Sequence, residues 1–402
     1  MISVDQMTVF RQYLALLPTA SLACLAKNSG YDKLHNDGLV KTFILANLLK
    51  WNSLRMIEGG IRSQSEIQQE LDVESFSAGQ LSRRLAVLDT GELSHILFQL
   101  TDHYHRIMEG EKGLNPKFGK LAIIDSSAIP LSKHALDWTA LTPHYCGVKI
   151  HLRLAIVKAN SAFPEAMIPS TANVPDIEAV NHLIVDDDAT YIADRGYGEK
   201  PKMAGWLERK VKFVVRVKSN FRVDTIQELP TDSEQVSRHA LVTIRSRPDP
   251  VKLVEFNDRK GRHFRLISSR LDLSALEIME IYKNRWLIEL FFKWLKQHVK
   301  VDHLYSQSPV GIWNQLYIAL ITFALMEIYR LLTYPNVTTA YFLRNIQLYL
   351  LQKWADARKE FERISEFTTQ GRKSNLGYPK KARDYGADHA IVNPLSRTPV
   401  IK

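Results

Sequence analysis

Cysteine is scarce in this sequence, and no apolar run is long enough for a membrane span. Among 402 residues there are two cysteines, Cys24 and Cys146, and their spacing fits no metal motif, which argues against a disulfide framework. The N-terminus has no basic region followed by an apolar core, so we expect no signal peptide and a reduced, cytoplasmic chain. The most apolar run, residues 316–329, is expected to form a buried core helix, without membrane contact.

Acidic side chains are too few to balance the basic ones. There are 53 Lys and Arg against 43 Asp and Glu, which gives a net charge of +10. Such an excess favours a polyanionic partner, and nucleic acid is expected before a membrane.

Hydrophobic patterns divide the chain into five predicted segments. Residues 1–115 are expected to form a helical domain, because apolar residues recur at helical spacing up to the Gly/Pro-rich stretch GLNPKFG. Strand and helix patterns alternate over 116–218, whereas 219–272 contains strand patterns alone. Helical patterns return over 273–335, and a helix followed by a polar, irregular tail is expected over 336–402. The sequence therefore predicts a mixed α/β fold.

Three acidic residues stand where a metal site can form. Asp125 ends the apolar run LAIID, and Asp194 ends ATYIAD just before the turn residues RGY. A carboxylate at the end of a buried strand points into the crevice where sheet ligands bind, although for either Asp alone a turn or helix cap is the better explanation. With Glu289 from a predicted helix, the set suits two hard divalent cations that bridge an attacking and a leaving oxygen.

Other acids and histidines fit a metal site less well. Asp186, Asp187 and Asp188 precede the second strand and are expected in a solvated turn. Three histidines have no ligand-like spacing and are not expected to bind metal: His134, His144 and His151.

The stretch YKNRWLIELFFKWLK, residues 282–296, places charged residues on an otherwise apolar helix. One face of a continuous helix over 273–300 would carry Tyr282, Arg285, Glu289, Lys293, Lys296 and Lys300, with Trp286 at its edge. A solvated face with intrahelical ion pairs is the ordinary explanation of such a stripe. If Glu289 holds metal, the cations would instead face DNA phosphates.

Four of these residues form the pattern Y-x2-R-x3-E-x6-K. It resembles the signature of DDE transposases of the insertion-sequence-four family, which are bacterial cut-and-paste elements. IIDSS and IADRGY resemble the two aspartate motifs of that family, and YCGVKIHL resembles its Gly-x-Lys-x-His strand. The resemblance covers residues 117–300 and implies an RNase H-like catalytic core with an all-β insertion at 219–272.

The resemblance also implies roles for individual residues. Asp125, Asp194 and Glu289 would hold two Mg²⁺ ions, for which Mn²⁺ would substitute. Tyr282, Arg285 and Lys296 would contact DNA phosphates near the cut, and Trp286 would lie against the terminal bases. Lys293 and Lys300 are outside the signature and are predicted DNA contacts because they lie on the same helix stripe. The implied activity is cleavage at terminal inverted repeats and strand transfer into target DNA, through a hairpin intermediate and in a homodimer, in the bacterial cytoplasm at the nucleoid.

The hairpin step needs an aromatic side chain to receive an unstacked base. The resemblance implies Trp286 near the terminal bases and a second aromatic from the β insertion. Residues 219–272 contain no tryptophan and offer Phe221, Phe256 and Phe264.

Two further regions are candidates for DNA contact. Residues 199–222 contain eight Lys and Arg and follow the Asp194 motif, so they suit a DNA backbone; the alternative is a helix and an edge strand with protective lysines. In residues 65–88, Ser77 and Gln80 form a capping-box pattern. A helix over 77–88 would carry Arg83 and Arg84, either as the reading helix of a helix-turn-helix or within a plain helical hairpin.

Two other functions use the same features. A metal-dependent nuclease without strand transfer would need the same three carboxylates, and a domesticated DNA-binding protein would need none of them. A transposase joins a labelled DNA end to a target, whereas the nuclease would cleave without joining. The domesticated protein would bind DNA without cleaving it.

Overall fold

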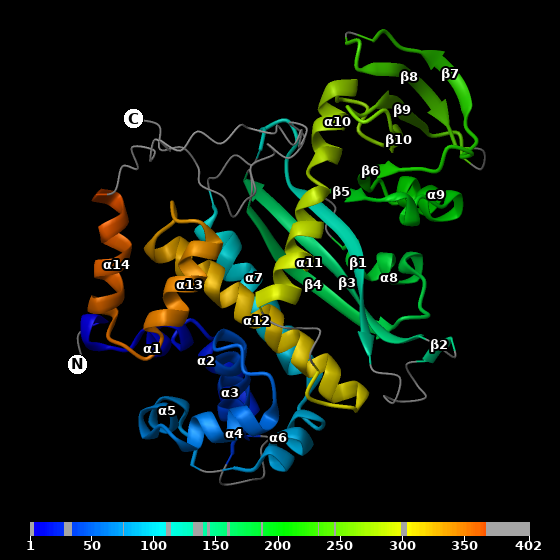
Figure 1. Ribbon diagram of the computed structural model, residues 1–402. Coiled ribbons are helices and arrows are strands. Elements are labelled where there is room, and N and C mark those ends of the chain that lie inside the picture. Colours follow the sequence, from blue (N-terminus) through cyan, green and yellow to red (C-terminus); the bar gives the residue numbers. More distant parts are fainter. Residues whose placement is uncertain are drawn as a thin grey trace, which may run out of the picture. The chain divides into compact units, whose positions relative to one another are not determined.

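The computed structural model describes residues 4–27, 34–74, 76–109, 114–131, 140–142, 145–158, 161–185, 188–231, 233–244, 247–298 and 304–366 (Figure 1). The chain forms two compact units, one of Met1–Ile107 with Ile321–Lys402 and one of Met108–Leu320. The boundary falls inside helix α12, Pro309–Thr333. The polar tail predicted after residue 366 lies outside the described residues.

The first unit is helical in its described residues. Its helices are η1 (Val4–Gln6), α1 (Val9–Leu14), α2 (Thr19–Lys27), α3 (Asn36–Leu48), α4 (Leu54–Arg62), α5 (Ser65–Leu71), α6 (Ala78–Leu85), α7 (Thr90–Ile107), α13 (Thr339–Tyr349) and α14 (Trp354–Glu366). Asn47 of α3 donates a hydrogen bond of 3.2 Å to Thr322 of α12. The later helices thus share a unit with the N-terminal ones, an association that periodicity along the chain does not reveal.

Helix α12 explains the most apolar run of the sequence. It is long and apolar enough to cross a membrane by length and composition, but 89% of its most apolar window is buried inside the protein. Within it, Glu327 and Arg330 form a buried ion pair, with side chains 4% and 6% exposed. A buried core helix, as the sequence predicts, accounts for these features.

The second unit is built on one ten-stranded sheet in its described residues. The strands are β1 (Leu121–Leu131), β2 (Ala140–Thr142), β3 (Tyr145–Lys158), β4 (Ser161–Thr171), β5 (Thr190–Ala193), β6 (Lys212–Arg216), β7 (Asp224–Glu228), β8 (Val236–Thr243), β9 (Pro250–Asn257) and β10 (His263–Ser268). Their order is β2-β3-β1-β5-β6-β10-β9-β8-β7, with β4 paired to β3. Strands β1, β5 and β6 run parallel, and the other pairs are antiparallel.

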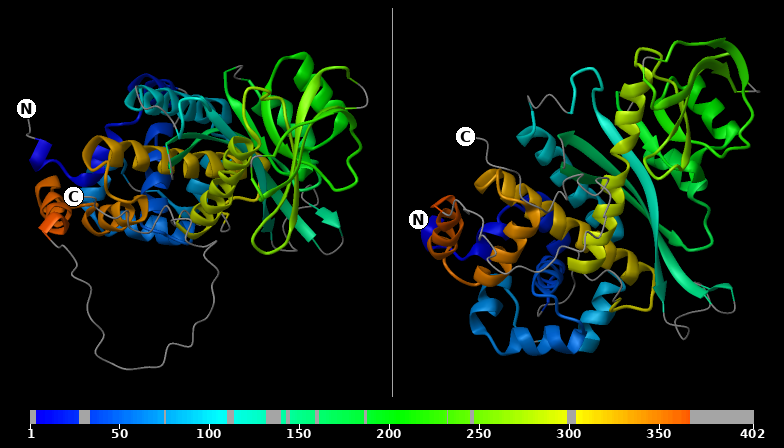
Figure 2. Two further views of the ribbon diagram at one scale, coloured as in Figure 1. Left: turned by 90° about the horizontal axis from the view of Figure 1, so that it is seen from above. Right: turned by 45° about the horizontal axis from the view of Figure 1, so that its top comes forward.

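Helices cover both faces of the parallel part of the sheet. Helices α8 (Asp176–Leu183) and α9 (Lys200–Glu208) lie on one face, and α10 (Ala275–Lys283) and α11 (Trp286–His298) follow one another along the other (Figures 1 and 2). Side chains of α8 and α9, such as Val180 and Trp206, share a buried cluster with Phe213 of β6. This burial fixes which face each strand residue presents.

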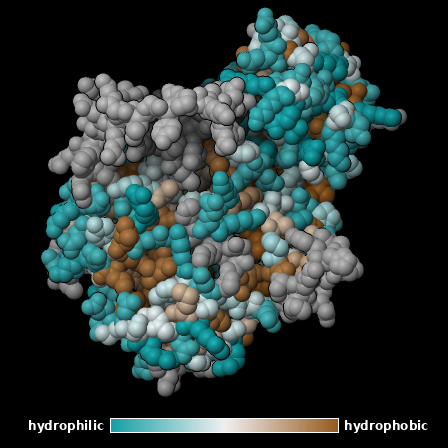
Figure 3. Space-filling view, viewed as in Figure 1, coloured by the Kyte–Doolittle hydropathy of each residue, from teal (hydrophilic) through white to brown (hydrophobic). Residues whose placement is uncertain are grey.

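The strand patterns of residues 219–272 correspond to β7, β8, β9 and β10. These strands continue the sheet, because β10 pairs with β6 over three residues, Leu266 with Arg216 through Ser268 with Val214. Their outer surface is mostly hydrophilic (Figure 3).

The continuous helix predicted over 273–300 is wrong. The chain forms two helices, α10 and α11, with Asn284 and Arg285 between them. There the backbone amides of Arg285, Leu287 and Ile288 bond carbonyls three residues earlier rather than four. This tighter winding turns Arg285 away from a regular helical position.

Candidate active site

Asp125 and Asp194 lie side by side because of the sheet register. Parallel pairing joins Leu121–Ile124 of β1 to Thr190–Ala193 of β5, ending at the pair Ile124 and Ala193. The next residue on each strand is one of the two aspartates. The sequence predicts that Asp125 ends its strand, but β1 continues to Leu131 in antiparallel pairing with β3. It marks the point where β1 and β5 separate.

Strand alternation places both aspartates on the face of the sheet that α10 and α11 cover. Ile124 and Ala193 belong to the buried cluster on the α8 and α9 face. Successive side chains of a strand point to opposite faces, so Asp125 and Asp194 point to the other side. Glu289, in the first turn of α11, reaches the same region. The three predicted carboxylates therefore lie on the same side of the sheet, with Arg285 between Asp125 and Glu289.

Arg285 and Tyr282 connect the carboxylates. The Arg285 guanidinium lies 2.5 Å from Glu289 and 3.5 Å from Asp125. Tyr282 donates a hydrogen bond of 3.2 Å to Asp194, and Arg216 of β6 lies 3.9 Å from the same carboxylate. Each acid thus has a cation or a hydroxyl group as its neighbour.

Burial changes the proton affinity of this site. It raises the pKa of Asp125 to about 6; the Ser126 amide and Arg285 oppose this rise, and Asp194 adds to it. Burial also raises the pKa of Tyr282, with a contribution from Asp194. The Arg285 pKa lies above its ordinary value although burial lowers it, because Tyr282 and Glu289 outweigh burial. Asp125 is thus a desolvated carboxylate that a cation would stabilise.

The donor set suits a hard divalent cation, which prefers carboxylate oxygens. In the described part of the chain, no three Asp, Glu, His or Cys side chains are close enough together to hold a metal ion. Arg285 lies between Asp125 and Glu289, with its guanidinium 3.5 Å from the first and 2.5 Å from the second. A metal ion would take over this compensating charge, and Arg285 would have to move.

A fourth acid, Asp176, lies behind Asp125 on the opposite face of the sheet. It begins α8, accepts a hydrogen bond of 2.6 Å from Ser126, and pairs with Lys149 at 3.0 Å. His151 Nδ1 lies 3.8 Å away, and burial lowers the His151 pKa to about 4, so the ring is neutral. Through Ser126, this network anchors the part of β1 that adjoins Asp125.

Sequence reasoning did not select Asp176 as a site residue. One signal was available, since Lys149 and His151 are the Lys and His of the Gly-x-Lys-x-His strand. Both stand in register with β1 residues of the α8 face, His151 opposite Ser126 and Lys149 opposite Ala128.

The remaining residues predicted on the helix stripe differ in exposure and in contacts. Trp286 is 45% exposed, and Lys293 is exposed as well. Lys296 donates a hydrogen bond of 3.2 Å to the Ala128 carbonyl of β1. Tyr282 is only 5% exposed. Lys300 lies outside the described residues.

The competing residues take other positions. Asp188 is exposed before β5, and His151 is buried in the Asp176 network. The others named above, Asp186, Asp187, His134 and His144, lie outside the described residues.

The predicted reading helix has one buried arginine. Ser77 caps α6, accepting a hydrogen bond of 3.2 Å from the Gln80 amide. Arg83 is exposed in the last turn of the helix, whereas Arg84 is 5% exposed and donates a hydrogen bond of 2.6 Å to Asn36. The predicted DNA contact by Arg84 conflicts with this burial, because its guanidinium bonds Asn36 and the Leu34 carbonyl.

The second unit has two aspartates where parallel strands separate and a glutamate from a helix on the same face of the sheet. Such an acid triad is suited to metal-dependent cleavage of phosphodiesters, and this defines the class of candidate to which the unit belongs. Residues 116–325 match the family described as "Transposase DDE domain", and the chain belongs to this family. All three acids lie within the matched residues.

Three curated relatives carry transposase names. "Putative transposase y4zB" of Sinorhizobium fredii is 29% identical over 218 residues, which cover 52% of this chain and 60% of that protein. "Probable transposase for insertion sequence element IS5377" of Geobacillus stearothermophilus is 22% identical over 72% of this chain and 75% of its own. "Putative transposase for insertion sequence element IS4SA" of Synechocystis is 22% identical, with coverages of 71% and 80%.

Proposed function

We propose that this chain is the transposase of an insertion sequence, which cuts DNA at the ends of its element and joins the freed 3′ ends to target DNA. The observation that carries the proposal is the placement of Asp125, Asp194 and Glu289 on one face of the sheet, linked through Arg285 and Tyr282. Membership of the family and the names of the relatives support the same activity.

In this proposal the three carboxylates hold divalent metal, Mg²⁺ with Mn²⁺ as a substitute. When bound, the metal activates the attacking oxygen and stabilises the leaving oxygen. Tyr282 orients Asp194 through its hydrogen bond, and Arg285 neutralises Asp125 and Glu289 until metal arrives. Once released from the acids, Arg285 is free to bind a DNA phosphate, as its place in the Y-x2-R-x3-E-x6-K pattern implies.

The DNA partners in this proposal are the terminal inverted repeats of the element and a target duplex. A homodimer would hold the two ends together, in the bacterial cytoplasm at the nucleoid. Lys296 and Lys293 would contact the backbone near the cut, and the net charge of +10 supports such binding.

A cut-and-paste route through a hairpin needs an aromatic platform. The phenylalanines of residues 219–272 already have partners: Phe256 stacks on Phe264 at 5.2 Å, and Arg216 lies 4.2 Å over the Phe264 ring. Phe221 is only 8% exposed. The exposed Trp286 is therefore the aromatic that we assign to the terminal bases, and Trp286→Ala should reduce hairpin formation several-fold while first-strand nicking persists.

The deciding experiment combines cleavage and joining. The full chain is incubated with Mg²⁺, end-labelled DNA from the flanks of its own gene and a target plasmid, beside the Glu289→Gln variant. Wild-type protein should nick the end and transfer label to the plasmid, and the variant should do neither. Cleavage without joining would make the protein a nuclease, and binding without cleavage would make it a DNA-binding protein.

A further inference from the structure

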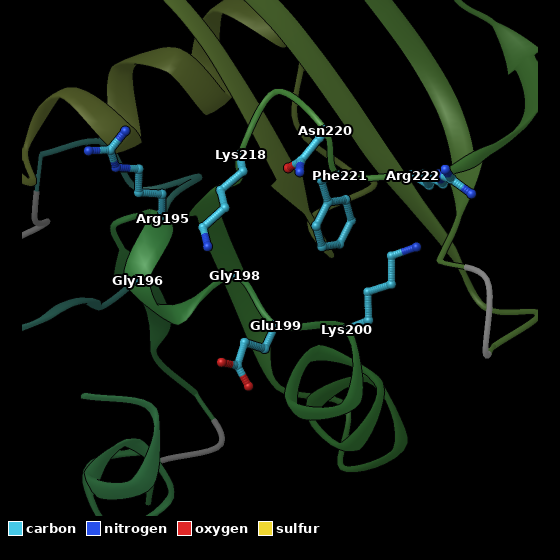
Figure 4. A pocket seen from close by; sticks show the side chains of 9 residues that line it. All are labelled: Arg195, Gly196, Gly198, Glu199, Lys200, Lys218, Asn220, Phe221 and Arg222. Carbon is cyan, nitrogen blue, oxygen red and sulfur yellow. The ribbon is translucent and has the colours of Figure 1, made fainter. Parts of the chain in front are cut away.

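A basic pocket opens at the carboxyl ends of β5 and β6, beside Asp194. It is lined by the segment from Arg195 to Lys200, after β5, and the segment from Lys218 to Arg222, after β6 (Figure 4). Ligands of open α/β sheets bind in the crevice outside the carboxyl ends of the strands. The cavity of about 390 Å³ is thus in the expected place for a ligand.

Close backbone packing builds this pocket. A Cβ atom on Gly198 would lie 3.0 Å from the Arg216 carbonyl oxygen and 3.1 Å from the Val217 side chain. The first segment therefore approaches the end of β6 more closely than a larger residue permits. Phe221, 8% exposed, carries the Lys200 ammonium 5.3 Å over its ring centre.

The cations of the pocket lack acidic partners. Lys218 extends from the loop after β6 and Lys200 from the start of α9, with their ammonium groups on either side of the Phe221 ring, whereas Glu199 points away (Figure 4). Among the residues that the structure describes, neither lysine forms an ion pair. Two like charges that face a shared cavity repel each other unless an anion lies between them.

A neighbouring pocket shows the opposite condition. It has a volume of about 620 Å³ and shares residues 220–222 with the first pocket, and its lining includes Arg238 and Arg265. Arg238 pairs with Glu228 at 2.6 Å, and Arg265 pairs with Glu255 at 2.6 Å. The two arginines that belong to that pocket alone are therefore neutralised, whereas Lys200 and Lys218, which line the first pocket alone, are not neutralised by any residue that the structure describes.

We propose that the pocket between Arg195–Lys200 and Lys218–Arg222 binds the phosphodiester backbone of one DNA strand next to the cleavage site. The cavity of about 390 Å³ lies between two chain segments and is too small to enclose a duplex, so it suits the backbone of a single strand. The inference deepens the proposed function, since Arg195 directly follows Asp194 and a strand held there leads to the carboxylates.

The test compares two double variants of the full chain. Lys200→Gln with Lys218→Gln changes the pocket. Lys202→Gln with Lys210→Gln is the control, because it removes the same charge from α9 and from the turn before β6 without touching the pocket lining. Fluorescence anisotropy measures binding of each variant to a labelled DNA single strand of about 20 nucleotides, the 20-mer, at several salt concentrations.

The pocket variant should bind about tenfold more weakly at ~100 mM salt, and its salt slope should fall by about 1.4, the value for two lost phosphate contacts on a single strand. The control variant should stay within about twofold of wild type. Thermal unfolding shows whether both variants keep their fold.

Equal losses in both variants would mean that net charge alone governs binding, and no loss in either would mean that the pocket binds no strand; each overturns the proposal. Displacement of the 20-mer by dAMP at equal phosphate concentration would also overturn it, in favour of a free-nucleotide site. Failure of the proposed function is distinguishable, because wild-type protein would then bind the strand through the pocket without cutting any end.

Discussion

Two adjacent regions of the second unit treat positive charge in opposite ways. On the α10 and α11 face, Arg285 is bound to Asp125 and Glu289, and Arg216 lies near Asp194. In the pocket that begins one residue later, Lys200 and Lys218 have no acidic partner among the described residues. The first region has three carboxylates against two guanidinium groups and suits a cation that exchanges with arginine. The second carries uncompensated charge and suits an anion.

The largest expected effect separates the two regions. Glu289→Gln keeps the shape of the side chain and removes a negative charge from the first region only. The rate of cleavage at a DNA end should fall more than ~100-fold, which exceeds the loss expected for a residue that only hydrogen-bonds to a metal ligand. Binding of the single-stranded 20-mer should stay unchanged. A gel assay and anisotropy on the same preparation check both, and cleavage within a few fold of wild type would refute the role of Glu289.

Asp176→Asn tests the contacts that anchor β1 on the opposite face of the sheet from the first region. It removes the charge that holds Lys149 and weakens the hydrogen bond from Ser126, which adjoins Asp125. We expect a loss of about 10–100-fold in metal affinity, typical of outer-shell changes. Calorimetric titration with Mn²⁺ measures it. Asp188→Asn, at an exposed acid outside the site, is the control and should leave affinity unchanged.

The distinction between paired and unpaired cations extends to α6 of the first unit. Arg84→Ala should cost about 2 kcal/mol of unfolding free energy, because Asn36 and the Leu34 carbonyl lose a charged donor. Arg83→Ala should change stability by less than ~0.5 kcal/mol, as for ordinary surface substitutions. Denaturant unfolding of both variants compares them. Equal losses would show that the two arginines are held alike.

The smallest effect concerns pH. Burial raises the pKa of Asp125 to about 6 from 3.8, so the folded state holds the proton more tightly than the unfolded state. The charged carboxylate therefore lowers stability above pH 6, and this cost disappears as the pH falls toward about 4. Asp125→Asn should raise the melting temperature of metal-free protein by a few degrees at about pH 8, and by less at about pH 5. The same gain at both pH values would contradict the raised pKa.

Much of the site follows from local sequence patterns. Apolar runs that end in an acid predict Asp125 and Asp194 near strand ends, and sheet register then places them side by side. The helix pattern predicts Glu289 among cations. The Gly-x-Lys-x-His strand and the helix at residue 176 were also readable, but their meeting at Asp176 depends on which face of the sheet α8 covers.

Tertiary contacts decide what local patterns leave open. Arg83 and Arg84 are neighbours with the same chemistry, and only the packing of α6 against residues 34–36 buries one of them. The break at Asn284 and Arg285 interrupts a periodicity that otherwise favours one long helix. The basic pocket joins segments that follow two different strands, so a count of charges along residues 199–222 indicates its sign but not its shape.

Metal binding by the purified full chain tests the central claim most directly. Calorimetric titration with Mn²⁺ is performed on wild type and on Asp125→Asn, Asp194→Asn and Glu289→Gln. The account predicts binding by wild type and at least about tenfold weaker binding by each variant, because each removes one carboxylate of the same site. Unchanged Mn²⁺ affinity in all three variants would contradict a metal site formed by Asp125, Asp194 and Glu289.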